Sequence, residues 1–552
     1  MHRRTFLKKS ALLSAATTLP FGFGIGCRRR YDFDTIIRGG VLYDGISETA
    51  ISGDVGIKNG KIAAVGSLQG KSCQREINAA NLVVAPGFID IHGHSDDNLL
   101  IDGRALSKIH QGVTTEVMGQ DGDSMAPLND AMFEERAERY KQRYHLENMW
   151  TDFTGYFDTL RAKGISMNVA SMVGAGTLRE NVIGMTDRPA TPEEMVKMQS
   201  LLTQALQQGA RHVSTGLEYT PGSFASTDEL AELVSVMGRD GVYATHMRNE
   251  DDHVLEAIEE AIAIAEKAGV KLNISHLKVQ GARNWDKLPE VLGLLDKART
   301  RGMHVTCDRY PYIAYSTGLT NLFPLWTREG GREAFLERLQ NPGLRNQIRA
   351  AVDEKIASLG SWNSVQISSL NKNIDWIGRK LGDLSQETGK PPFNFLMDLM
   401  LEEGGRGGMV GFGMSEENTE AILKYPYTVV GSDGSALAEE GLLAMGNPHP
   451  RNYGTFARVL GYYVREKKSF SLAEAIRKMT SLPADILGLP DRGRLAEGNW
   501  ADIVIFDPDK VQDNATFEQP KQFSSGFHFV FVNGIAVLEN DEHLGTKPGV
   551  VL

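Results

Sequence analysis

Cysteine is scarce in this sequence: among 552 residues there are three, at Cys27, Cys73 and Cys307. Three scattered cysteines are too few for a disulfide scaffold, and they lack the paired spacing of a cysteine-based zinc module. A metal in this protein would therefore have to be held by histidine and carboxylate side chains.

The sequence also lacks an excess of positive charge and any low-complexity segment. Its 59 Lys and Arg stand against 70 Asp and Glu, which gives a net charge of −11. Such a surface repels polyanions, so we expect no nucleic-acid partner. With 41% hydrophobic and 23% charged residues, the composition is that of a globular protein. The length predicts one large core and a smaller second one.

A long hydrophobic run is missing as well. The apolar stretch from Ala11 to Phe23 is interrupted by Thr, Pro and Gly, and it is shorter than the ~20 residues that cross a bilayer. Together with Arg3 and Arg4 it predicts an export signal over 1–26 and no transmembrane segment. Residues 3–8 resemble a twin-arginine signal, which predicts a periplasmic protein exported after folding. A disordered basic tail is the alternative, and a lipid anchor at Cys27 stays open.

The two ends of the remaining chain share one sequence pattern. In 27–86 and again in 484–552, short apolar runs alternate with Gly, Asn and Asp turns, a pattern typical of strands and hairpins. Because the middle of the chain differs, we predict that both ends build one small β-sandwich.

The middle, 87–483, alternates strand-like apolar runs with helical stretches, which indicates an α/β fold. Eight β/α units predict a (β/α)₈ TIM-like barrel, with its active site at the C-terminal ends of the strands. A connection of about 311–427 is too long for a loop, so we expect a lid or small subdomain there. The eight runs are Gly87–His94, Thr114–Asp121, Ser166–Val173, Arg211–Leu217, Val242–Met247, Lys271–Leu277, His304–Tyr310 and Thr428–Asp433.

Histidines and carboxylates stand at the C-terminal ends of five of these runs. Because residues two apart on a strand point the same way, the first run turns two histidines to the barrel mouth. Nitrogen and oxygen ligands of this kind suit zinc, and the set could hold one or two ions. Ordinary polar residues that end strands are the alternative. The predicted metal ligands are His92, His94, Asp121, His246, His276 and Asp433.

A bound metal would supply hydroxide at neutral pH and polarise a carbonyl oxygen. We assign the proton transfer to Asp433, although Asp-Gly is also a common turn dipeptide. Lys278 should face the same cavity, Tyr310 ends the seventh run, and Arg451 follows the eighth. These three could hold a carboxylate of the substrate. The alternative is that they are surface salt-bridge residues.

With these residues the chain resembles the amidohydrolase superfamily, and within it the D-aminoacylases, which are N-acyl-D-amino-acid deacylases. The resemblance covers essentially all of 31–552. It is carried by Pro86-Gly-Phe-Ile-Asp-Ile-His-Gly-His94, Tyr243-Ala-Thr-His-Met-Arg-Asn-Glu250, Ser275-His-Leu-Lys278, Asp308-Arg-Tyr-Pro-Tyr312, Ser432-Asp-Gly434 and His449-Pro-Arg-Asn-Tyr-Gly-Thr-Phe456.

The resemblance implies zinc on the four histidines, Asp433 as acid and base, and Lys278, Tyr310 and Arg451 on the substrate α-carboxylate. Two positions depart from the family pattern. Where these deacylases have Asn-Cys-Gly with a zinc-binding cysteine, this chain has Gln120-Asp121-Gly122. Where they have Gly-His-Gly-Thr-Leu-Arg, it has Ala175 in place of the histidine.

The sequence therefore predicts an exported, zinc-dependent amidohydrolase that cleaves N-acyl-D-amino acids to a carboxylate and a D-amino acid. Three alternatives stay open: a cyclic-amide hydrolase, a D-dipeptidase, and a catalytically silent binding protein. A glycosidase on the same barrel would need two carboxylates at the strand ends without the histidines, so the four histidines argue against that activity.

Overall fold

The computed structural model describes residues 31–144, 146 and 149–552. The predicted signal at 1–26 and Cys27 lie outside these residues. No helix in the described ranges is both long and apolar enough to pass through a lipid bilayer.

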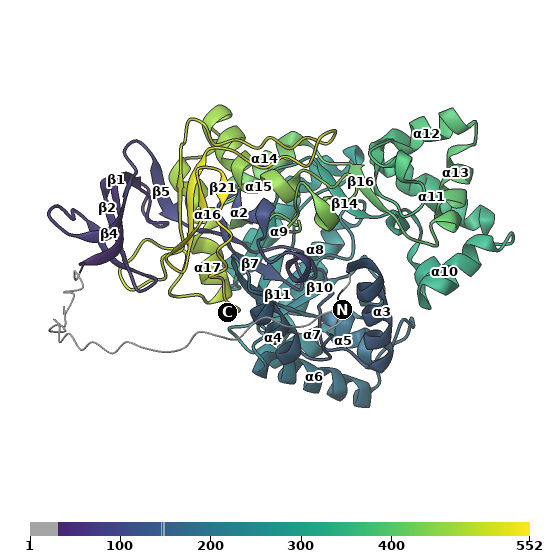
Figure 1. Cartoon of the computed structure of the whole chain (residues 1–552). Helices are drawn as coiled ribbons and strands as arrows, with labels where there is room; N and C mark the ends of the chain where they lie inside the picture. The colour runs from purple at the N-terminus through teal and green to yellow at the C-terminus, as the bar shows by residue number, and fades with distance from the viewer. Residues whose placement is uncertain (1–30, 145, 147–148) are drawn as a thin grey trace, which may run out of the picture.

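Parallel strands in chain order form the centre of the molecule (Figure 1). Two sheets contribute, one ordered β6-β7-β8 and the other β9-β10-β11-β12-β13-β17. The chain runs from β8 straight into β9, and a parallel bridge between Gly93 and Gly434 links the first position to the last. The predicted (β/α)₈ barrel is thus present in the described residues. Its strands are β6 (Phe88–Asp90), β7 (Val113–Met118), β8 (Asn168–Ser171), β9 (Val173–Gly174), β10 (Val213–Gly216), β11 (Val242–His246), β12 (Lys271–Ile274), β13 (Val305–Arg309) and β17 (Thr428–Val430).

Amphipathic helices cover the barrel. In α8 (Val254–Ala268), Val254, Ala257, Ile258 and Ala261 are buried at helical spacing, so one stripe faces the strands and the other faces water. The remaining helices of this part are α1 (Asn98–Ile101), α2 (Leu106–Ile109), α3 (Asp130–Tyr144), α4 (Phe153–Lys163), α5 (Ala175–Val182), α6 (Pro192–Gln207), α7 (Thr227–Val234), α9 (Leu288–Thr300), α14 (Glu416–Lys424), α15 (Arg451–Arg458), α16 (Leu472–Met479) and α17 (Ser481–Leu487).

Both ends of the described chain build one sheet, ordered β21-β20-β19-β18-β5-β1-β2-β3, with β4 beside β1. Its inner residues, among them Ile37, Val55, Ile503 and Phe531, share a hydrophobic core. The sheet bends back on itself, since the Ile62 N–H donates to Asn499 O just before β18. The shared terminal β-domain is therefore present. Its strands are β1 (Phe33–Leu42), β2 (Ile51–Lys58), β3 (Lys61–Gly66), β4 (Cys73–Asn78), β5 (Val83–Pro86), β18 (Ile503–Phe506), β19 (Phe527–Val532), β20 (Ile535–Glu539) and β21 (Glu542–His543).

The long connection after β13 is a subdomain with its own core, which includes Phe335, Ile348, Phe393 and Leu396. It combines the antiparallel strands β14 (Ala314–Gly318), β15 (Val365–Ser369) and β16 (Gly408–Phe412) with α10 (Gly331–Gln340), α11 (Arg345–Leu359), α12 (Leu381–Thr388) and α13 (Pro392–Glu402). α14 packs on β13 and β17, so the separately packed part ends before α14.

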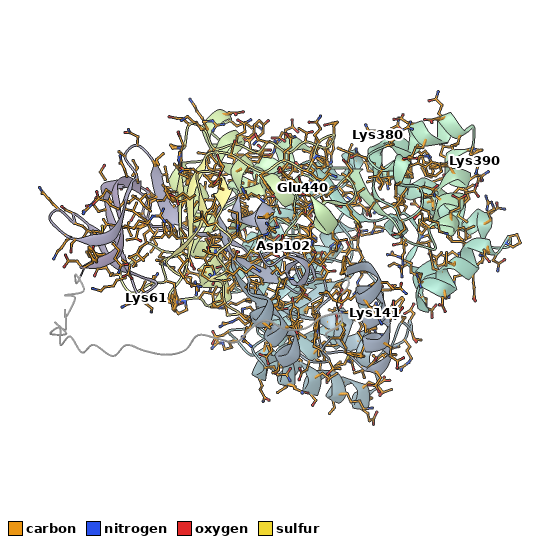
Figure 2. The ribbon with its side chains drawn as sticks, viewed as in Figure 1. Lys61, Asp102, Lys141, Lys380, Lys390 and Glu440 are labelled. Carbon is orange, nitrogen blue, oxygen red and sulfur yellow. The ribbon has the colours of Figure 1, made fainter. Side chains whose placement is uncertain are left out.

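The subdomain and the terminal sheet lie at opposite ends of the molecule, with the barrel between them (Figure 1). Figure 2 marks the two ends by Lys380 and Lys390 on the subdomain and by Lys61 on the terminal sheet.

Candidate metal centre and active site

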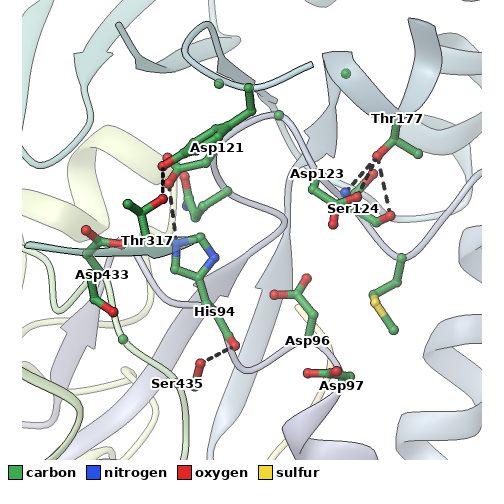
Figure 3. Close-up of a pocket in the computed structure, with 18 of the residues that line it drawn as sticks. His94, Asp96, Asp97, Asp121, Asp123, Ser124, Thr177, Thr317, Asp433 and Ser435 are labelled. Atoms are coloured by element: carbon green, nitrogen blue, oxygen red, sulfur yellow. Dashed lines mark hydrogen bonds and ion pairs between the residues drawn. The ribbon is translucent and has the colours of Figure 1, made fainter. Parts of the chain in front are cut away.

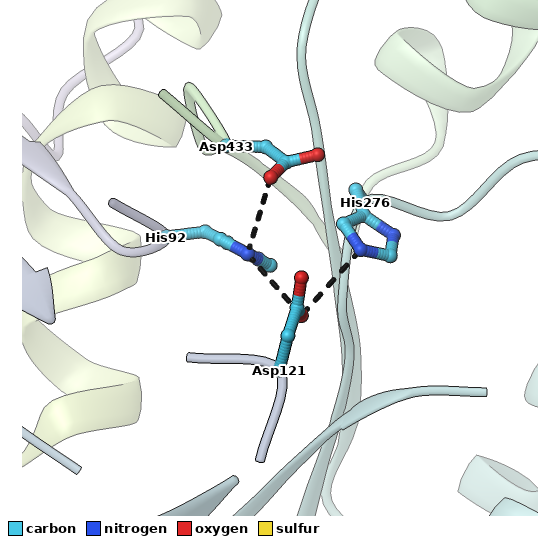
Figure 4. Close-up of side chains that lie close together, drawn as sticks. All are labelled: His92, Asp121, His276 and Asp433. Atoms are coloured by element: carbon cyan, nitrogen blue, oxygen red, sulfur yellow. Dashed lines mark ion pairs between the residues drawn. The ribbon is translucent and has the colours of Figure 1, made fainter. Parts of the chain in front are cut away.

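The six predicted metal ligands meet at the barrel mouth, and we call them the mouth cluster: His92, His94, Asp121, His246, His276 and Asp433. Asp121 lies at its centre. Its Oδ1 is 3.5 Å from Nε2 of both His92 and His276, and its Oδ2 is 3.6 Å from His94 Nε2 and from His246 Nδ1. Figure 4 shows four members of this arrangement. The Asp that stands where the family pattern has Cys thus faces all four histidines.

Asp433 approaches the cluster from the other side. Its Oδ1 is 3.1 Å from His94 Nε2 and 3.7 Å from His92 Nε2. Its Oδ2 accepts a hydrogen bond of 2.7 Å from an Arg451 guanidinium nitrogen. Asp433 therefore contacts both the histidines and Arg451, which the sequence predicts to belong to the same site.

Three members of the cluster have left-handed backbone. The φ angles of Asp121, His276 and Asp433 are +54°, +37° and +49°, a region that side chains with a Cβ rarely adopt. Each residue stands just beyond the end of a barrel strand, where the chain turns sharply. Backbone strain of this kind concentrates at functional sites because the surrounding structure has to enforce it.

Several polar atoms of the cluster are buried without a hydrogen-bond partner in the described part of the chain. They are Asp121 Oδ1, His92 Nδ1 and both ring nitrogens of His246. Buried polar atoms in native proteins are normally satisfied, so unsatisfied ones call for an explanation such as an ion. Clustered imidazole nitrogens and carboxylate oxygens are the ligands that zinc accepts. The residues present therefore fit a divalent metal.

Sequence reasoning missed the carboxylates behind these histidines. His276 Nδ1 is 3.1 Å from Glu250 Oε1, His92 Nδ1 is 3.3 Å from Asp308 Oδ1, and His246 Nε2 is 3.6 Å from a carboxylate oxygen of Glu218. Carboxylates in this position commonly orient metal-binding histidines. The available signals were the four-residue spacing of His246 and Glu250, and the place of Asp308 and Glu218 near the ends of β13 and β10.

These carboxylates make the cluster strongly anionic. Burial lowers the pKa of His246, but Glu250, Asp121 and Glu218 outweigh it and raise the pKa to about 10. Burial raises the pKa of Asp121, but the surrounding histidines pull it well below the usual range. The same field that holds a proton on His246 would attract a metal cation in its place.

The predicted carboxylate-binding residues lie around the cluster. Lys278 is buried, with Nζ 2.7 Å from Glu250 Oε1 and 2.6 Å from His276 Nδ1. Tyr310 is buried, and its hydroxyl has no hydrogen-bond partner within the described ranges. The Arg451 guanidinium lies 4.9 Å from the centre of the Tyr310 ring. Arg451 and Tyr310 are thus adjacent, whereas Lys278 lies on the His276 side.

A cavity of about 800 Å³ opens in front of the cluster, and its lining includes His94, Asp121, Asp433 and Arg451. Figure 3 shows Asp96 and Asp123 farther along the wall. Thr317 and neighbouring residues of the subdomain close one side, so the subdomain borders the site, as expected for a lid or subdomain. A smaller cavity next to it is lined by His246, His276 and Lys278.

Several histidines outside the mouth cluster contact backbone atoms or solvent. His110 and His212 approach backbone carbonyl oxygens, and His253 is exposed. His449 lines the large cavity, but its ring is held by Ala314 O and the Arg451 N–H. His145 lies outside the described residues.

Behind the mouth is a second group of buried charged and polar side chains, which we call the closed cluster: Lys108, Asp90, Glu116 and Ser432. Lys108 Nζ donates to Asp90 Oδ2 at 2.7 Å, to Ser432 Oγ at 2.7 Å and to Gly434 O at 2.8 Å. It is also 3.2 Å from Glu116 Oε2. The cluster ties β6 to the turn that carries Asp433.

The amidohydrolase family profile matches residues 75–360 and 391–537 of this chain. A D-aminoacylase of Alcaligenes xylosoxydans xylosoxydans is 36% identical over 524 residues, which cover 94% of this chain and 97% of the relative.

Two solved structures resemble the whole fold. A D-aminoacylase described with a binuclear metal centre superposes with a TM-score of 0.78 at 36% identity, over 94% of this chain and 99% of that one. The N-acyl-D-glutamate deacylase of Bordetella bronchiseptica, bound to zinc and to a phosphonate inhibitor that mimics the tetrahedral intermediate, superposes with a TM-score of 0.80 at 33% identity over the same shares. The chain therefore belongs to the amidohydrolase family, in the group of D-aminoacylases.

Proposed function

We propose that this protein hydrolyses the amide bond of N-acyl-D-amino acids with the help of zinc, releasing a carboxylate and a D-amino acid. The observation that carries the proposal is the mouth cluster, in which four histidines and two aspartates meet beside the Arg451 guanidinium. Relatives that match nearly the whole chain are deacylases of this kind.

The metal would be held by His92, His94, His246 and His276, with Asp121 and Asp433 as carboxylate ligands. Potential ligand atoms fall into two overlapping groups, one with His92, Asp121, His276 and Asp433, and the other with His246, Glu250 and His276. The set therefore has room for one or two ions. When bound, zinc provides a Lewis acid for the amide carbonyl and a nucleophile from water at neutral pH.

Asp433 moves the proton. Burial raises its pKa, but Arg451 and the histidines lower it far below the usual range, so the carboxylate is ionised at neutral pH. An ionised carboxylate oxygen in this position can accept a proton from the attacking water. The same oxygen can return that proton to the nitrogen of the leaving amine. The 2.7 Å pair with Arg451 fixes the direction in which the carboxylate faces.

Arg451, Tyr310 and Lys278 recognise the α-carboxylate of the substrate. The planar fork of an arginine suits a carboxylate, and the buried Tyr310 hydroxyl, whose ring lies beside Arg451, adds a donor. Lys278, buried against Glu250, supplies a second positive charge. A substrate whose amide faces the metal ligands would place its acid group among these three.

The test is a screen of N-acetyl-D- and N-acetyl-L-amino acids, D-dipeptides and cyclic amides with the zinc-loaded protein. We expect hydrolysis of the D-series. Because a charge-assisted hydrogen bond contributes roughly 1.5–3 kcal/mol, Arg451→Ala should lower kcat/KM at least about tenfold with the metal retained, and Arg451→Lys should lose less. Faster hydrolysis of the L-series, or full activity in Arg451→Ala, would contradict the assignment.

We also propose that residues 1–26 direct the protein to the periplasm. The support is the pair Arg3 and Arg4 before a short apolar run. Replacing both arginines by lysine should leave the protein in the cytoplasm, as fractionation would show. Lipid labelling of wild type and Cys27→Ala would reveal whether Cys27 anchors the exported protein.

A further inference from the structure

A separate cavity of about 290 Å³ lies between the barrel and the subdomain. Glu218 and Asn321 line it, and they also line the small cavity beside His246 and Glu250. Asn321 Nδ2 donates to a Glu218 carboxylate oxygen at 3.3 Å, and the same oxygen is 3.6 Å from His246 Nε2. The cavity is therefore separated from the metal ligands by these two side chains.

Most cations of this cavity are neutralised within the protein. Arg248 pairs with Glu260 at 2.9 Å, Lys355 with Asp251 at 2.9 Å, and Arg283 with Asp252. These ion pairs neutralise three of the four Lys and Arg side chains that line the cavity, and the fourth is Arg328.

Arg328, at the end of the 3₁₀ turn η5 (Leu325–Arg328), has no hydrogen bond or ion pair among the residues that the structure describes, and its Nε is buried without a partner. Burial lowers its pKa, and the nearby Glu218 only partly offsets this. Arg328 as a whole is half-buried, so its guanidinium is open to the cavity and can donate hydrogen bonds to an anion there.

Apolar side chains of the subdomain form part of the wall next to Arg328. Pro324, Leu325 and Ala351 are half-buried and line the cavity, whereas Leu322 and Phe323 are almost fully buried beneath it. Glu354, Lys355 and Ser358 of α11 make the rest of this wall polar. An unpaired cation beside the apolar side chains of Pro324, Leu325 and Ala351 is complementary to an organic acid: the carboxylate would bind the guanidinium, and an aliphatic tail would cover these three side chains.

We propose that this cavity is a second binding site, separate from the mouth cluster, for an aliphatic carboxylate held by Arg328. Its ligand is the acid that hydrolysis releases, and this identification rests on the proposed function. Because the site is separate from the metal ligands, excess substrate does not displace the acid. Glu218 lines the Arg328 cavity and also lies close to His246. A ligand that shifts Glu218 can therefore slow hydrolysis at the metal site.

The experiment measures hexanoate binding to the zinc-loaded protein by titration calorimetry, together with inhibition of N-hexanoyl-D-amino-acid hydrolysis, the reaction that releases hexanoate. Hexanamide has the same tail without charge, and inorganic phosphate is an anion without a tail. Both should bind at least tenfold more weakly than hexanoate. Arg328→Met should weaken the non-competitive component of hexanoate inhibition at least tenfold, whereas Arg332→Met, an exposed arginine nearby, should leave it unchanged.

Ala351→Phe provides a second test, because it fills the cavity from α11 and leaves Arg328 in place. Unchanged hexanoate binding in folded Arg328→Met or folded Ala351→Phe overturns the proposal. So does inhibition that substrate fully relieves, or phosphate binding as tight as that of hexanoate. D-leucine serves as the amine product: if it, and not hexanoate, depends on Arg328, the released acid is not the ligand.

The two proposals can fail separately. If the wild type hydrolyses no N-acyl-D-amino acid but its hexanoate binding still depends on Arg328, the proposed function is wrong and the carboxylate site stands. If hydrolysis occurs and hexanoate binding is insensitive to Arg328, the site is wrong and the function stands.

Discussion

The closed cluster and the mouth cluster are both groups of buried charges at the same end of the barrel, and they differ in how their polar atoms are satisfied. Lys108 donates to three oxygens, and Glu116 accepts from the backbone and hydroxyl of Ser95. In the mouth cluster, His92 Nδ1 and both ring nitrogens of His246 have no hydrogen-bond partner among the described residues. Satisfied charges hold the protein together, and unsatisfied ones mark where a ligand binds.

The two clusters are also joined along the chain. Asp90 lies two residues before His92, and Ser432 precedes Asp433. The Ser432 N–H donates to Asp90 Oδ1 at 2.9 Å, and the Ser95 N–H donates to Glu116 Oε1 at 3.0 Å. Groups fixed on rigid elements position reactive side chains more accurately than loops do. The closed cluster therefore sets the geometry on which the mouth cluster depends.

The largest expected effect follows from breaking the closed cluster. Lys108→Met removes its cation and leaves Asp90 and Glu116 buried without compensation, which costs about 3–5 kcal/mol of unfolding free energy. Urea denaturation would measure the loss. Lys141→Met, on the surface of α3 (Figure 2), is the matched control and should change stability little. Equal stability of the two variants would show that the closed cluster is not structural.

Variants of the mouth cluster should lose bound metal and activity, with little loss of stability. His276→Ala removes a predicted ligand, so we expect loss of bound metal and of hydrolysis, with unfolding affected far less than in Lys108→Met. Metal analysis of the purified protein and hydrolysis before and after chelation would measure this. Glu250→Gln, which removes the charge behind His276, should weaken metal binding by about 10–100-fold. Full activity in a metal-free preparation would contradict the metal assignment.

Much of this comparison could be predicted from the sequence, because each mouth histidine directly follows an apolar strand run. Strand order in a barrel then brings residues hundreds of positions apart to one place. Asp121 and Asp433 were found by the same rule. The zinc-ligand and carboxylate-binding roles of these residues stay predictions until variants are measured.

The closed cluster and the outer carboxylates were not predicted, for a physical reason. Lysine and glutamate are almost always exposed, so neither Lys108 nor Glu116 signals burial by its type. The one hint is that Glu116 interrupts the otherwise uncharged strand Val113–Met118. Which carboxylate stands behind which histidine depends on the loops that follow the strands, and apolar periodicity says nothing about loop paths.

The smallest and finest test concerns Asp121, because it asks which metal the mouth cluster prefers. Its two oxygens face all four histidines, so Asp121→Ala should weaken metal binding. A carboxylate is a harder ligand than a thiolate, so we expect wild type to accept manganese or cobalt more readily than Asp121→Cys does. Asp121→Cys should restore the binding lost in Asp121→Ala and shift the preference toward zinc. Competition between zinc and manganese, read by metal analysis, would measure the shift. Unchanged affinity in Asp121→Ala would show that the histidines and Asp433 hold the ion without Asp121.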